Sequence, residues 1–576
     1  MTVPLFKLYI LSILFFTSHL AVQAQPEWFR QFESDQMVGL GRFCEAPNGS
    51  WYAIASFKGN TDFDPGPGTA MLFADPGQFN MWSQFALLHF TANGELIWVK
   101  SFNTFGNLCF FTSISISSQG DLVLSGYHEY QVDLEPGPGE TLSTSFSNAP
   151  GYKGFLLRLN TDGDLQSVAY FRVLSTSSDA IPMDVVYTYT GEKYVVMNIG
   201  GEADLDPSEA VVEVGTAGGT GGSNEMLLLK LNAEDSLLWF KKWAPTTIAS
   251  IKLNAVELDS NGNVFVGGFV HETVDLNPGE DTLWVDANRD PAVISLNADG
   301  EYLWSPGFPG PTGLKAITDI QLYNDSLVFA GFFYDTLNTD TSASALQFVS
   351  NGQQDIFLGK MDLQGNLGWI KAFGSSGPEE TFNLQITGEE LVISGFFNAP
   401  LDFDPGMGNV TQSPVGSFDL YVLSLNHAGD FERLYTRGSP SADFASFGRT
   451  EGPYYLIAGF TDSTLVLNPS PAKASIVSAA GRDAFFARFI PSEVNVVSQS
   501  APDNSRLFPN PSKGLLQVSG LTAPAQIRVY DTFGRCVGEF VCESNQAISL
   551  SHCSNGVYIV EVKTQYDRVF HKIVIE

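Results

Sequence analysis

The feature of this sequence that most constrains its fold is one short phrase that recurs along most of the chain. The phrase consists of an acidic residue, an apolar residue, a second acidic or amide residue, and then Pro, which Gly follows in most copies. The clear copies are Asp62-Phe63-Asp64-Pro65-Gly66, Asp133-Leu134-Glu135-Pro136-Gly137, Asp204-Leu205-Asp206-Pro207, Asp275-Leu276-Asn277-Pro278-Gly279 and Asp402-Phe403-Asp404-Pro405-Gly406. Degenerate copies stand at Leu337-Asn338 and Leu467-Asn468-Pro469. The first four begin at 62, 133, 204 and 275, a constant step of 71 residues, which indicates an array of one repeated unit.

Other phrases recur in step with this acidic loop. An apolar segment ending in Gly and an aromatic residue, such as Gly459-Phe460, precedes it, and an alternating segment such as Phe85 to Phe90 follows it. A tight turn such as Asn93-Gly94 then leads to a segment marked in most copies by Trp. The Trp residues are Trp98, Trp239, Trp304 and Trp369, and Val168 and Glu432 stand near the equivalent place in two weaker copies. Four antiparallel strands per unit are typical of a propeller blade.

The two ends of the array indicate how it closes. The last third-strand segment, 484–489, has no Trp segment after it, whereas an orphan segment, Trp28 to Phe32, precedes the first unit. If the N-terminal strand completes the last blade, the ring closes and no edge strand stays exposed. We therefore predict an all-β fold in which residues 25–490 form a seven-bladed β-propeller. A string of β-sandwiches is the alternative, but the extra length of each unit falls in the acidic loop, which favours the propeller.

These repeated phrases resemble the SBBP-type bacterial propeller repeats across the whole region. The resemblance implies the fold more than an activity, because propellers host many activities.

The first 24 residues are typical of a signal peptide. Lys7 precedes the apolar run Leu8 to Phe16, and Val22-Gln23-Ala24 places small residues at the cleavage positions before Gln25. A membrane anchor is the alternative, but the run ends at Thr17 and is too short to span a bilayer comfortably. We expect an exported mature chain without a transmembrane anchor.

The C-terminal region departs from the repeat. Residues 491–505 are polar and rich in Pro and Ser, as expected of a linker, and residues 506–576 contain a new set of alternating segments that predicts a small β-sandwich. Its motif residues are Pro509, Asn510, Pro511, Gly514, Tyr530, Asp531, Gly534, Arg535, Gly556, Tyr558 and Lys572.

In order and spacing these motifs resemble the C-terminal sorting domain of type IX secretion substrates in Bacteroidetes-type bacteria. The resemblance implies the type IX secretion machinery as a partner, passage across the outer membrane and removal of the domain. It also implies release from the cell or attachment to surface lipopolysaccharide. The sequence departs from the domain type in its three cysteines, Cys536, Cys542 and Cys553.

Charge and cysteine content narrow the functional classes. With 30 basic and 63 acidic side chains the chain carries a formal charge of −33, which excludes nucleic acid as a natural partner and allows cations. Five cysteines are an odd number, and Cys44 and Cys109 are the two within the propeller region, so disulfides cannot carry its stability.

The sequence contains no catalytic motif. It lacks Gly-x-Ser-x-Gly, His-Glu-x-x-His and a P-loop. His89, His128, His271 and His427 do not recur at one position of the repeat, which favours ordinary strand or loop roles. We therefore expect a protein that is not an enzyme.

The acidic loops are the candidate binding site. Residues i and i+2 of an extended segment point the same way, so the paired side chains could converge on one Ca²⁺ ion. The candidate ligands are Asp62, Asp64, Asp133, Glu135, Asp204, Asp206, Asp275, Asn277, Asp402 and Asp404. In the alternative, structural interpretation, each Asp accepts hydrogen bonds from loop N–H groups and Pro-Gly makes the turn.

These observations favour a secreted or surface-displayed binding or adhesion module with an extracellular glycan or protein ligand. The mostly equivalent loops support binding, because an enzyme should have one blade whose loop departs from the others. A secreted hydrolase or lyase that uses acidic loop residues, and a structural surface-layer component, are the two alternatives.

Overall fold

The computed structural model describes residues 27–490 and 506–576 apart from short internal gaps. The gaps are 75–83, 106, 118–119, 145–150, 176–177, 217–224, 244–251, 280, 309–312, 340–345, 389, 407, 469–473, 477–480, 522–523, 532–535, 544–545 and 564–567. The predicted signal peptide and the predicted linker 491–505 lie outside the described residues. Within the described ranges all the regular elements are β-strands, and these ranges contain no helix that is long and apolar enough to cross a membrane.

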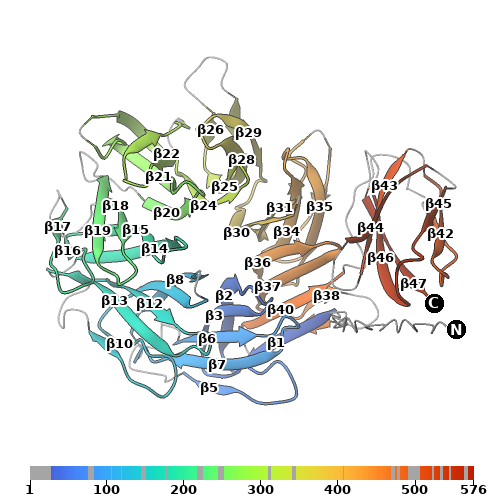
Figure 1. Ribbon diagram of the computed structural model, residues 1–576, viewed down its shortest axis with the longest axis horizontal. Coiled ribbons are helices and arrows are strands. Elements are labelled where there is room, and N and C mark those ends of the chain that lie inside the picture. The colour runs from blue at the N-terminus through green and yellow to red at the C-terminus, as the bar shows by residue number, and fades with distance from the viewer. Residues whose placement is uncertain are drawn as a thin grey trace, which may run out of the picture.

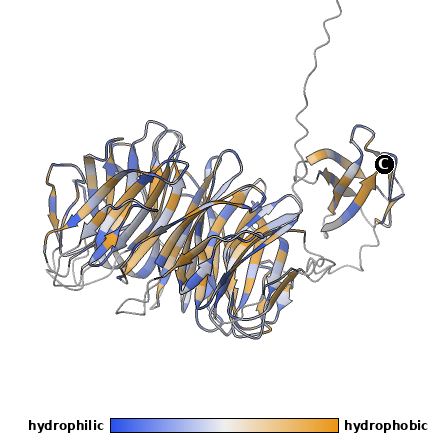
Figure 2. Cartoon of the chain, turned by 90° about the horizontal axis from the view of Figure 1, so that it is seen from below, coloured by the Kyte–Doolittle hydropathy of each residue, from blue (hydrophilic) through white to orange (hydrophobic). Residues whose placement is uncertain are grey.

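The first body is a ring of sheets, and the second, β41 to β47, stands beside it (Figure 1). Seven groups of four antiparallel strands occur among the described residues of the ring, each ordered from an inner first strand to an outer fourth strand. Both hydrophobic and hydrophilic residues occur along these strands (Figure 2), and the third strand of blade 1, Gln84–Phe90, is buried along its whole length. The all-β propeller architecture predicted from the repeat is thus confirmed.

We number these groups as blades in chain order. Blade 1 contains β2 (Met37–Glu45), β3 (Trp51–Lys58), β6 (Gln84–Phe90) and β7 (Leu96–Phe102). Blade 2 contains β8 (Cys109–Ile116), β9 (Leu122–His128), β12 (Lys153–Leu159) and β13 (Leu165–Val173). Blade 3 contains β14 (Asp179–Tyr187), β15 (Lys193–Gly200), β18 (Glu225–Leu231) and β19 (Leu237–Trp243). Blade 4 contains β20 (Lys252–Leu258), β21 (Val264–Asp275), β22 (Trp284–Leu296) and β23 (Tyr302–Trp304). Blade 5 contains β24 (Lys315–Tyr323), β25 (Ser326–Phe333), β28 (Asp355–Asp362) and β29 (Leu367–Phe373). Blade 6 contains β30 (Glu380–Thr387), β31 (Glu390–Phe397), β34 (Asp419–Asn426) and β35 (Phe431–Arg437). Blade 7 contains β36 (Asp443–Glu451), β37 (Tyr454–Thr461), β40 (Asp483–Phe489) and β1 (Trp28–Ser34).

The N-terminal strand closes the ring as predicted. In β1, Trp28 pairs with Arg488 and Phe32 with Ala484 of β40, so the fourth strand of blade 7 comes from the opposite end of the chain. The edge of the Trp28 ring also packs on Phe486, with 4.9 Å between the ring centroids. Pairing and packing together join the two termini of the propeller.

The recurrent Trp and the recurrent turn glycine form one contact between neighbouring blades. Gly94 of blade 1 has φ +69°, and a Cβ atom placed on it would lie 2.6 Å from the ring of Trp28 in blade 7. The same contact joins Trp98 to Gly163, at 2.6 Å, and Trp304 to Gly365, at 2.7 Å. We call this contact the Trp–Gly clasp; it explains why the two residue types recur together.

The register of the strands corrects the position assigned to two weaker copies. Trp239 pairs opposite Lys230, and the equivalent pairs in blades 2 and 6 are Ser167 with Arg158 and Arg433 with Ser424. The residues in the Trp position are therefore Ser167 and Arg433, each one residue away from Val168 and Glu432. The spacing along the chain agrees with this register: Trp98 lies four residues after Gly94, and Ser167 and Arg433 likewise lie four residues after the turn glycines Gly163 and Gly429.

The glycine of each Gly-aromatic pair allows the inner strand to come close. Every inner strand contains a register shift, for example between Phe111 and Ser113. A Cβ atom on Gly126 would lie 2.4 Å from the carbonyl oxygen of Phe110 in the adjoining inner strand. Neighbouring inner strands are also joined by side-chain hydrogen bonds, such as Thr112 Oγ1 to the Pro182 carbonyl at 2.7 Å.

The second body consists of two packed sheets. The first contains β41 (Arg506–Phe508), β42 (Leu515–Ser519) and β45 (Gln546–Ser549), and the second contains β44 (Cys536–Cys542), β43 (Ala525–Tyr530), β46 (Gly556–Lys563) and β47 (Arg568–Ile575). Ile527, Val560 and Ile573 are fully buried between them. This is the small β-sandwich predicted for the C-terminal region.

The Trp–Gly clasp predicts a measurable stability difference between two glycines. Gly94→Ala should destabilise the protein by about 2–4 kcal/mol, because it strains a left-handed backbone and also displaces the Trp28 ring. The control is Gly120→Ala: Gly120 has φ +88° but nothing within 4 Å of the added Cβ, so this change tests backbone strain alone. Urea denaturation measures both. Equal losses would show that the clasp contributes nothing.

Candidate functional site on the loop face

The acidic loops form small hairpins on one side of the ring. They are β4 (Asn60–Asp62) with β5 (Met71–Phe73), β10 (Gln131–Asp133) with β11 (Leu142–Thr144), β16 (Glu202–Asp204) with β17 (Glu213–Gly215), β26 (Thr336–Asn338) with β27 (Gln347–Val349), β32 (Leu401–Asp402) with β33 (Thr411–Gln412), and β38 (Leu465–Asn468) with β39 (Ala474–Ile476). In blade 4 the hairpin continues directly from β21 and β22.

Each hairpin leaves its own blade between the second and third strands. Asp62 pairs with Glu33 of β1, and Asp204 pairs with Arg172 of β13, so these hairpins extend the sheet of the preceding blade. The Asn-Gly and Asp-Gly turns lie at the opposite ends of the strands. We call the side with the hairpins the loop face and the other side the turn face.

The first aspartate of each loop holds the loop closed. Asp62 Oδ1 accepts hydrogen bonds from the Asp64 N–H at 3.0 Å and the Ala70 N–H at 2.8 Å. The same i+2 and i+8 pattern recurs at Asp133, Asp204, Asp275 and Asp402, with distances of 2.7–3.2 Å. One carboxylate oxygen thus satisfies two backbone donors across an eight-residue loop in five blades.

The apolar residue between the two polar positions anchors the loop to the core. Phe63, Leu134, Leu205 and Phe403 are fully buried, and so are Leu337 and Leu467 in the degenerate copies. Because neighbouring side chains of an extended segment alternate, burial of the middle residue directs both flanking side chains away from the core.

The second polar position makes a local turn. The Oδ1 atoms of Asp64 and Asp404 each accept a bond from the Gly N–H two residues later at 2.8 Å, and Asn277 Oδ1 accepts the same bond from Gly279 at 2.9 Å. The amide of Asn277 does here what a carboxylate does in other blades, so this contact does not require charge. In Glu135 the longer side chain accepts from Thr141 Oγ1 instead, at 2.8 Å.

These bonds support the structural interpretation of the acidic loops. In the part of the chain described here, no group of three or more His, Cys, Asp or Glu side chains is arranged to hold a metal ion. Calcium binding by the loop residues therefore stays a prediction, and the geometry of the loops does not depend on it.

The propeller histidines pack as ordinary side chains where their contacts are described. His89 stacks on Tyr52, with ring centroids 4.1 Å apart, and its Nε2 lies 2.9 Å from Ser50 Oγ. His128 Nε2 lies 2.8 Å from Ser143 Oγ, and burial lowers the pKa of His128 to about 3. Both rings sit within the blades, each against a serine hydroxyl.

A second acidic feature lies on the inner strands and had no signal in the sequence. Asp184 of β14, Glu257 of β20 and Asp319 of β24 come from three consecutive blades, and we call them the axial carboxylates. Asp184 Oδ2 accepts the Val256 N–H at 3.2 Å, and Asp319 Oδ2 accepts the Leu384 N–H at 3.1 Å. Two of the three carboxylates thus join neighbouring inner strands.

Burial raises the pKa of all three groups, and repulsion from neighbouring carboxylates adds to this for Glu257 and Asp319. Burial raises the pKa of Asp184 to about 6 and that of Asp319 to about 7. It also raises the pKa of Glu257 to about 8, and the negative charges of Asp184 and Asp319 act in the same direction. Carboxyl groups in this range could exchange protons at physiological pH.

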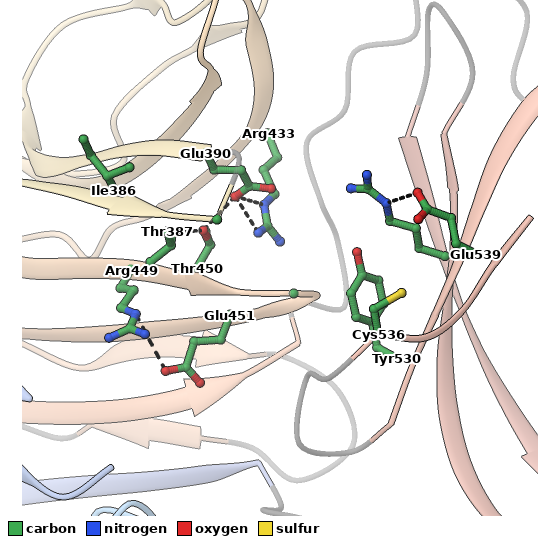
Figure 3. Close-up of a pocket in the computed structure, with 13 residues that line it drawn as sticks. Ile386, Thr387, Glu390, Arg433, Arg449, Thr450, Glu451, Tyr530, Cys536 and Glu539 are labelled. Atoms are coloured by element: carbon green, nitrogen blue, oxygen red, sulfur yellow. Dashed lines mark hydrogen bonds and ion pairs between the residues drawn. The ribbon is translucent and has the colours of Figure 1, made fainter. Parts of the chain in front are cut away.

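A polar pocket of about 740 Å³ lies between blades 6 and 7 and the C-terminal sandwich (Figure 3). Arg433 donates to Glu390 Oε2 at 2.7 Å, and Thr450 Oγ1 donates to the same oxygen at 2.7 Å. On the other side Arg528 pairs with Glu539 at 3.0 Å. The charges that line the pocket thus pair within each body.

The pocket lies at the seam of the ring. The third and fourth strands of blade 7 come from opposite ends of the chain, so no turn joins them and blade 7 offers no glycine to a Trp from blade 6. Arg433 occupies that Trp position, and its guanidinium lies 4.9 Å from the centre of the Tyr455 ring. Beside the pocket, Lys563 of the sandwich pairs with Glu432 of blade 6 at 2.7 Å.

The motif residues of the C-terminal sandwich have structural roles where they are described. Asn510 Nδ2 donates to the Lys572 carbonyl at 2.8 Å, and Asn510 Oδ1 accepts from the Val574 N–H at 2.8 Å. The Tyr530 hydroxyl donates to Glu561 Oε2 at 2.6 Å, and the Tyr558 hydroxyl donates to the Ser554 carbonyl at 2.8 Å.

The remaining motif residues lie at bends or ends of strands. Gly514 has φ +84°, which favours glycine, and Asp531 is buried directly after β43. Pro509 and Pro511 flank Asn510 after β41, and Gly556 begins β46. Gly534 and Arg535 lie outside the described residues.

The loop geometry predicts different effects for two substitutions of Asp62. Asp62→Asn keeps the Oδ1 acceptor and should change stability by less than about 1 kcal/mol. Asp62→Ala leaves two backbone donors without their acceptor and should cost about 1–3 kcal/mol. Thermal melts with Ca²⁺ or with a chelator make the comparison. If Asn costs as much as Ala, and Ca²⁺ raises the melting temperature of the wild type alone, the loops are calcium sites.

The axial carboxylates predict a pH-dependent stability. A carboxyl group whose pKa is raised by folding binds its proton more tightly in the native state, so stability falls as pH rises from about 4.5 to 8. Glu257→Gln removes this loss and should stabilise the protein by about 1–2 kcal/mol at pH 9 and by little at pH 4.5. Glu209→Gln, an exposed change of the same charge, is the control. A gain independent of pH would contradict the assignment.

Comparison with known proteins identifies one part of the chain. Residues 506–576 match the family model of the secretion system C-terminal sorting domain. No curated protein matches the chain.

Solved structures with β-rich folds resemble the chain weakly. A neuraminidase-like protein of subtype N10 from A/little yellow-shouldered bat/Guatemala/060/2010 is 9% identical, covers 72% of this chain and 98% of its own, and has a TM-score of 0.29. PorZ, a surface component of the type IX secretion system of Porphyromonas gingivalis, is 10% identical, covers 95% and 100%, and has a TM-score of 0.18. The endosialidase of phage phi92 is 10% identical, covers 95% and 87%, and has a TM-score of 0.32. Likenesses at this level say nothing about activity or ligand.

The match over residues 506–576 agrees with the motifs that the structure places in the C-terminal sandwich. These residues are a secretion system C-terminal sorting domain, and the chain is exported by type IX secretion to the cell surface or the extracellular space.

Proposed function

We propose that this exported chain is a seven-bladed propeller of the SBBP repeat type that acts as a binding or adhesion module, with its loop face as the binding surface. The observation that carries the proposal is the equivalence of the loops. Five blades close their loop with the same pair of hydrogen bonds to the first aspartate, and the middle apolar residue is buried in each.

Equivalent loops favour binding over catalysis for a physical reason. A catalytic centre needs acid, base and orienting groups at one place, so one blade has to differ from the others there. A binding surface gains from repetition, because several similar contacts with one large ligand raise the overall affinity. The hydrogen-bonded loops repeat one arrangement around the ring, as a binding surface requires.

A second candidate function rests on the axial carboxylates. A carboxyl group with a raised pKa can serve as a general acid, and Glu257 lies near Asp184 and Asp319, whose charges affect it. This arrangement favours a hydrolase or lyase of extracellular polymers. However, Asp184 and Asp319 already accept backbone hydrogen bonds between blades, which supports a role in joining them.

The binding function can be tested with arrays of glycans and extracellular matrix proteins probed with the full mature chain. Replacing Glu209 and Glu213 with Arg, both exposed on the loop face, should reduce binding of array ligands at least tenfold. Replacing Asp162 and Asp299 with Arg, both exposed on the turn face, should leave binding within twofold. The two variants change the charge equally.

The outcomes separate the candidates. Loss of binding only in the turn-face variant would place the surface on the other side of the ring, and absence of any array ligand would contradict a binding module. Release of soluble fragments from an array polymer by the wild type, abolished by Glu257→Gln, would instead support the enzyme.

A further inference from the structure

Exposed apolar side chains gather on or directly beside the loop hairpins. In six consecutive blades such a residue protrudes from the loop between the second and third strands. These residues are Phe73, Leu142, Val211, Trp284, Val349 and Val415, which we call the rim residues. Phe73 keeps 71% of its surface exposed, Trp284 55% and Val415 70%. They carry no common motif in the sequence, because this part of the loop varies in length and composition between copies.

The rim residues contribute little to the stability of the propeller. The buried anchor of each hairpin is a different residue, such as Phe63 or Leu205, which is fully enclosed. Single exposed apolar side chains are ordinary on protein surfaces. One such residue in the same loop of six consecutive blades is less ordinary, because all six then lie on the loop face, although their positions within the loop differ. Exposed apolar surface of this kind indicates an interaction site.

The hairpin strands that carry or adjoin the rim residues also lie at the edges of their sheets. In the described part of the chain β5, β11, β17, β27 and β33 are each the last strand of their sheet. The side chains of Met71 and Phe73 are exposed and that of Leu72 between them is half-buried, so one side-chain face of the edge strand β5 points to solvent. An extended polypeptide can add to such an edge through main-chain hydrogen bonds.

The charge around the rim selects the partner. Glu202 and Glu213 are exposed on the paired strands of the blade 3 hairpin, beside Val211, and the whole chain has a formal charge of −33. Acidic side chains beside apolar ones complement a segment with both basic and apolar residues. Five of the six rim side chains have no hydrogen-bonding group, so they suit apolar side chains better than the hydroxyl groups of a glycan.

We propose that the rim of the loop face binds extended polypeptide segments in which apolar and basic residues alternate. The proposal rests on the proposed binding function and names the class of its partner. Each edge strand is only two or three residues long, so a single contact is weak. Repetition around the ring then supplies avidity for a long or repetitive partner.

The test uses the full mature chain and three fluorescent peptides of equal length, with alternating Lys and Leu, Glu and Leu, or Lys and Ser. Fluorescence anisotropy at about 150 mM salt should show binding of the Lys-Leu peptide and at least tenfold weaker binding of the other two. Changing the six rim residues to Ser should weaken binding of the Lys-Leu peptide at least tenfold, although every charge is retained.

A matched variant controls for loss of apolar surface elsewhere. Ile97, Tyr189, Leu238 and Leu303 are also exposed but lie away from the hairpins, and changing all four to Ser should leave affinity within twofold. Thermal melts show that both variants are folded. Equal binding of the Lys-Leu peptide by wild type and rim variant would overturn the proposal, because charge alone would then explain it. A glycan ligand that the rim variant still binds would also overturn it, yet leave the binding function intact; absence of any ligand would remove both.

Discussion

The pairing of β1 with β40 is the interaction on which the rest of the propeller depends. It brings together strands that are more than 450 residues apart in the chain, since Trp28 lies opposite Arg488. Loop-closure entropy opposes such a contact, but that cost grows only slowly with chain length. The closed ring then lets every blade pack between two neighbours. The Trp–Gly clasp repeats the same solution between blades, and Trp28 extends it across the closure to Gly94.

Closure also explains where the structure departs from its own repeat. Blade 7 has no turn between its third and fourth strands, so the clasp that blade 6 would make is missing. Arg433 stands in the Trp position, and Glu390 and Thr450 complete a polar cluster around it. The polar pocket next to the sorting domain is thus a consequence of how the two chain ends meet. A buried arginine of this kind requires its carboxylate, since a lone buried charge would be strongly destabilising.

On the loop face, the residues that stabilise the loops are different from the residues of the proposed binding surface. Within each acidic loop, the first aspartate and the buried apolar residue between the polar positions hold the backbone. The variable part of the loop, which includes Phe73 and Val415, does not hold the backbone in this way, and its apolar side chains stay exposed. A fixed frame with variable exposed positions is a general property of loops that carry binding functions. The sorting domain brings this surface to the outside of the cell.

Much of the architecture follows from the sequence by itself, because repeated motifs and alternating apolar residues can be recognised in the sequence directly. The 71-residue step, the Gly-aromatic pairs and the orphan Trp28 segment predicted the blades and their closure, and the Pro509 to Lys572 motifs predicted the sorting domain. The sequence also predicted the local hydrogen bonds of the acidic loops, as the structural alternative to calcium binding. Only the tertiary structure decided what depends on several blades at once. It placed Asp184, Glu257 and Asp319 together, and it brought the rim residues to one face. The physical reason is that these arrangements depend on contacts between blades: the pairing of strands and the curvature of the ring determine which side chains meet, whatever their separation along the chain.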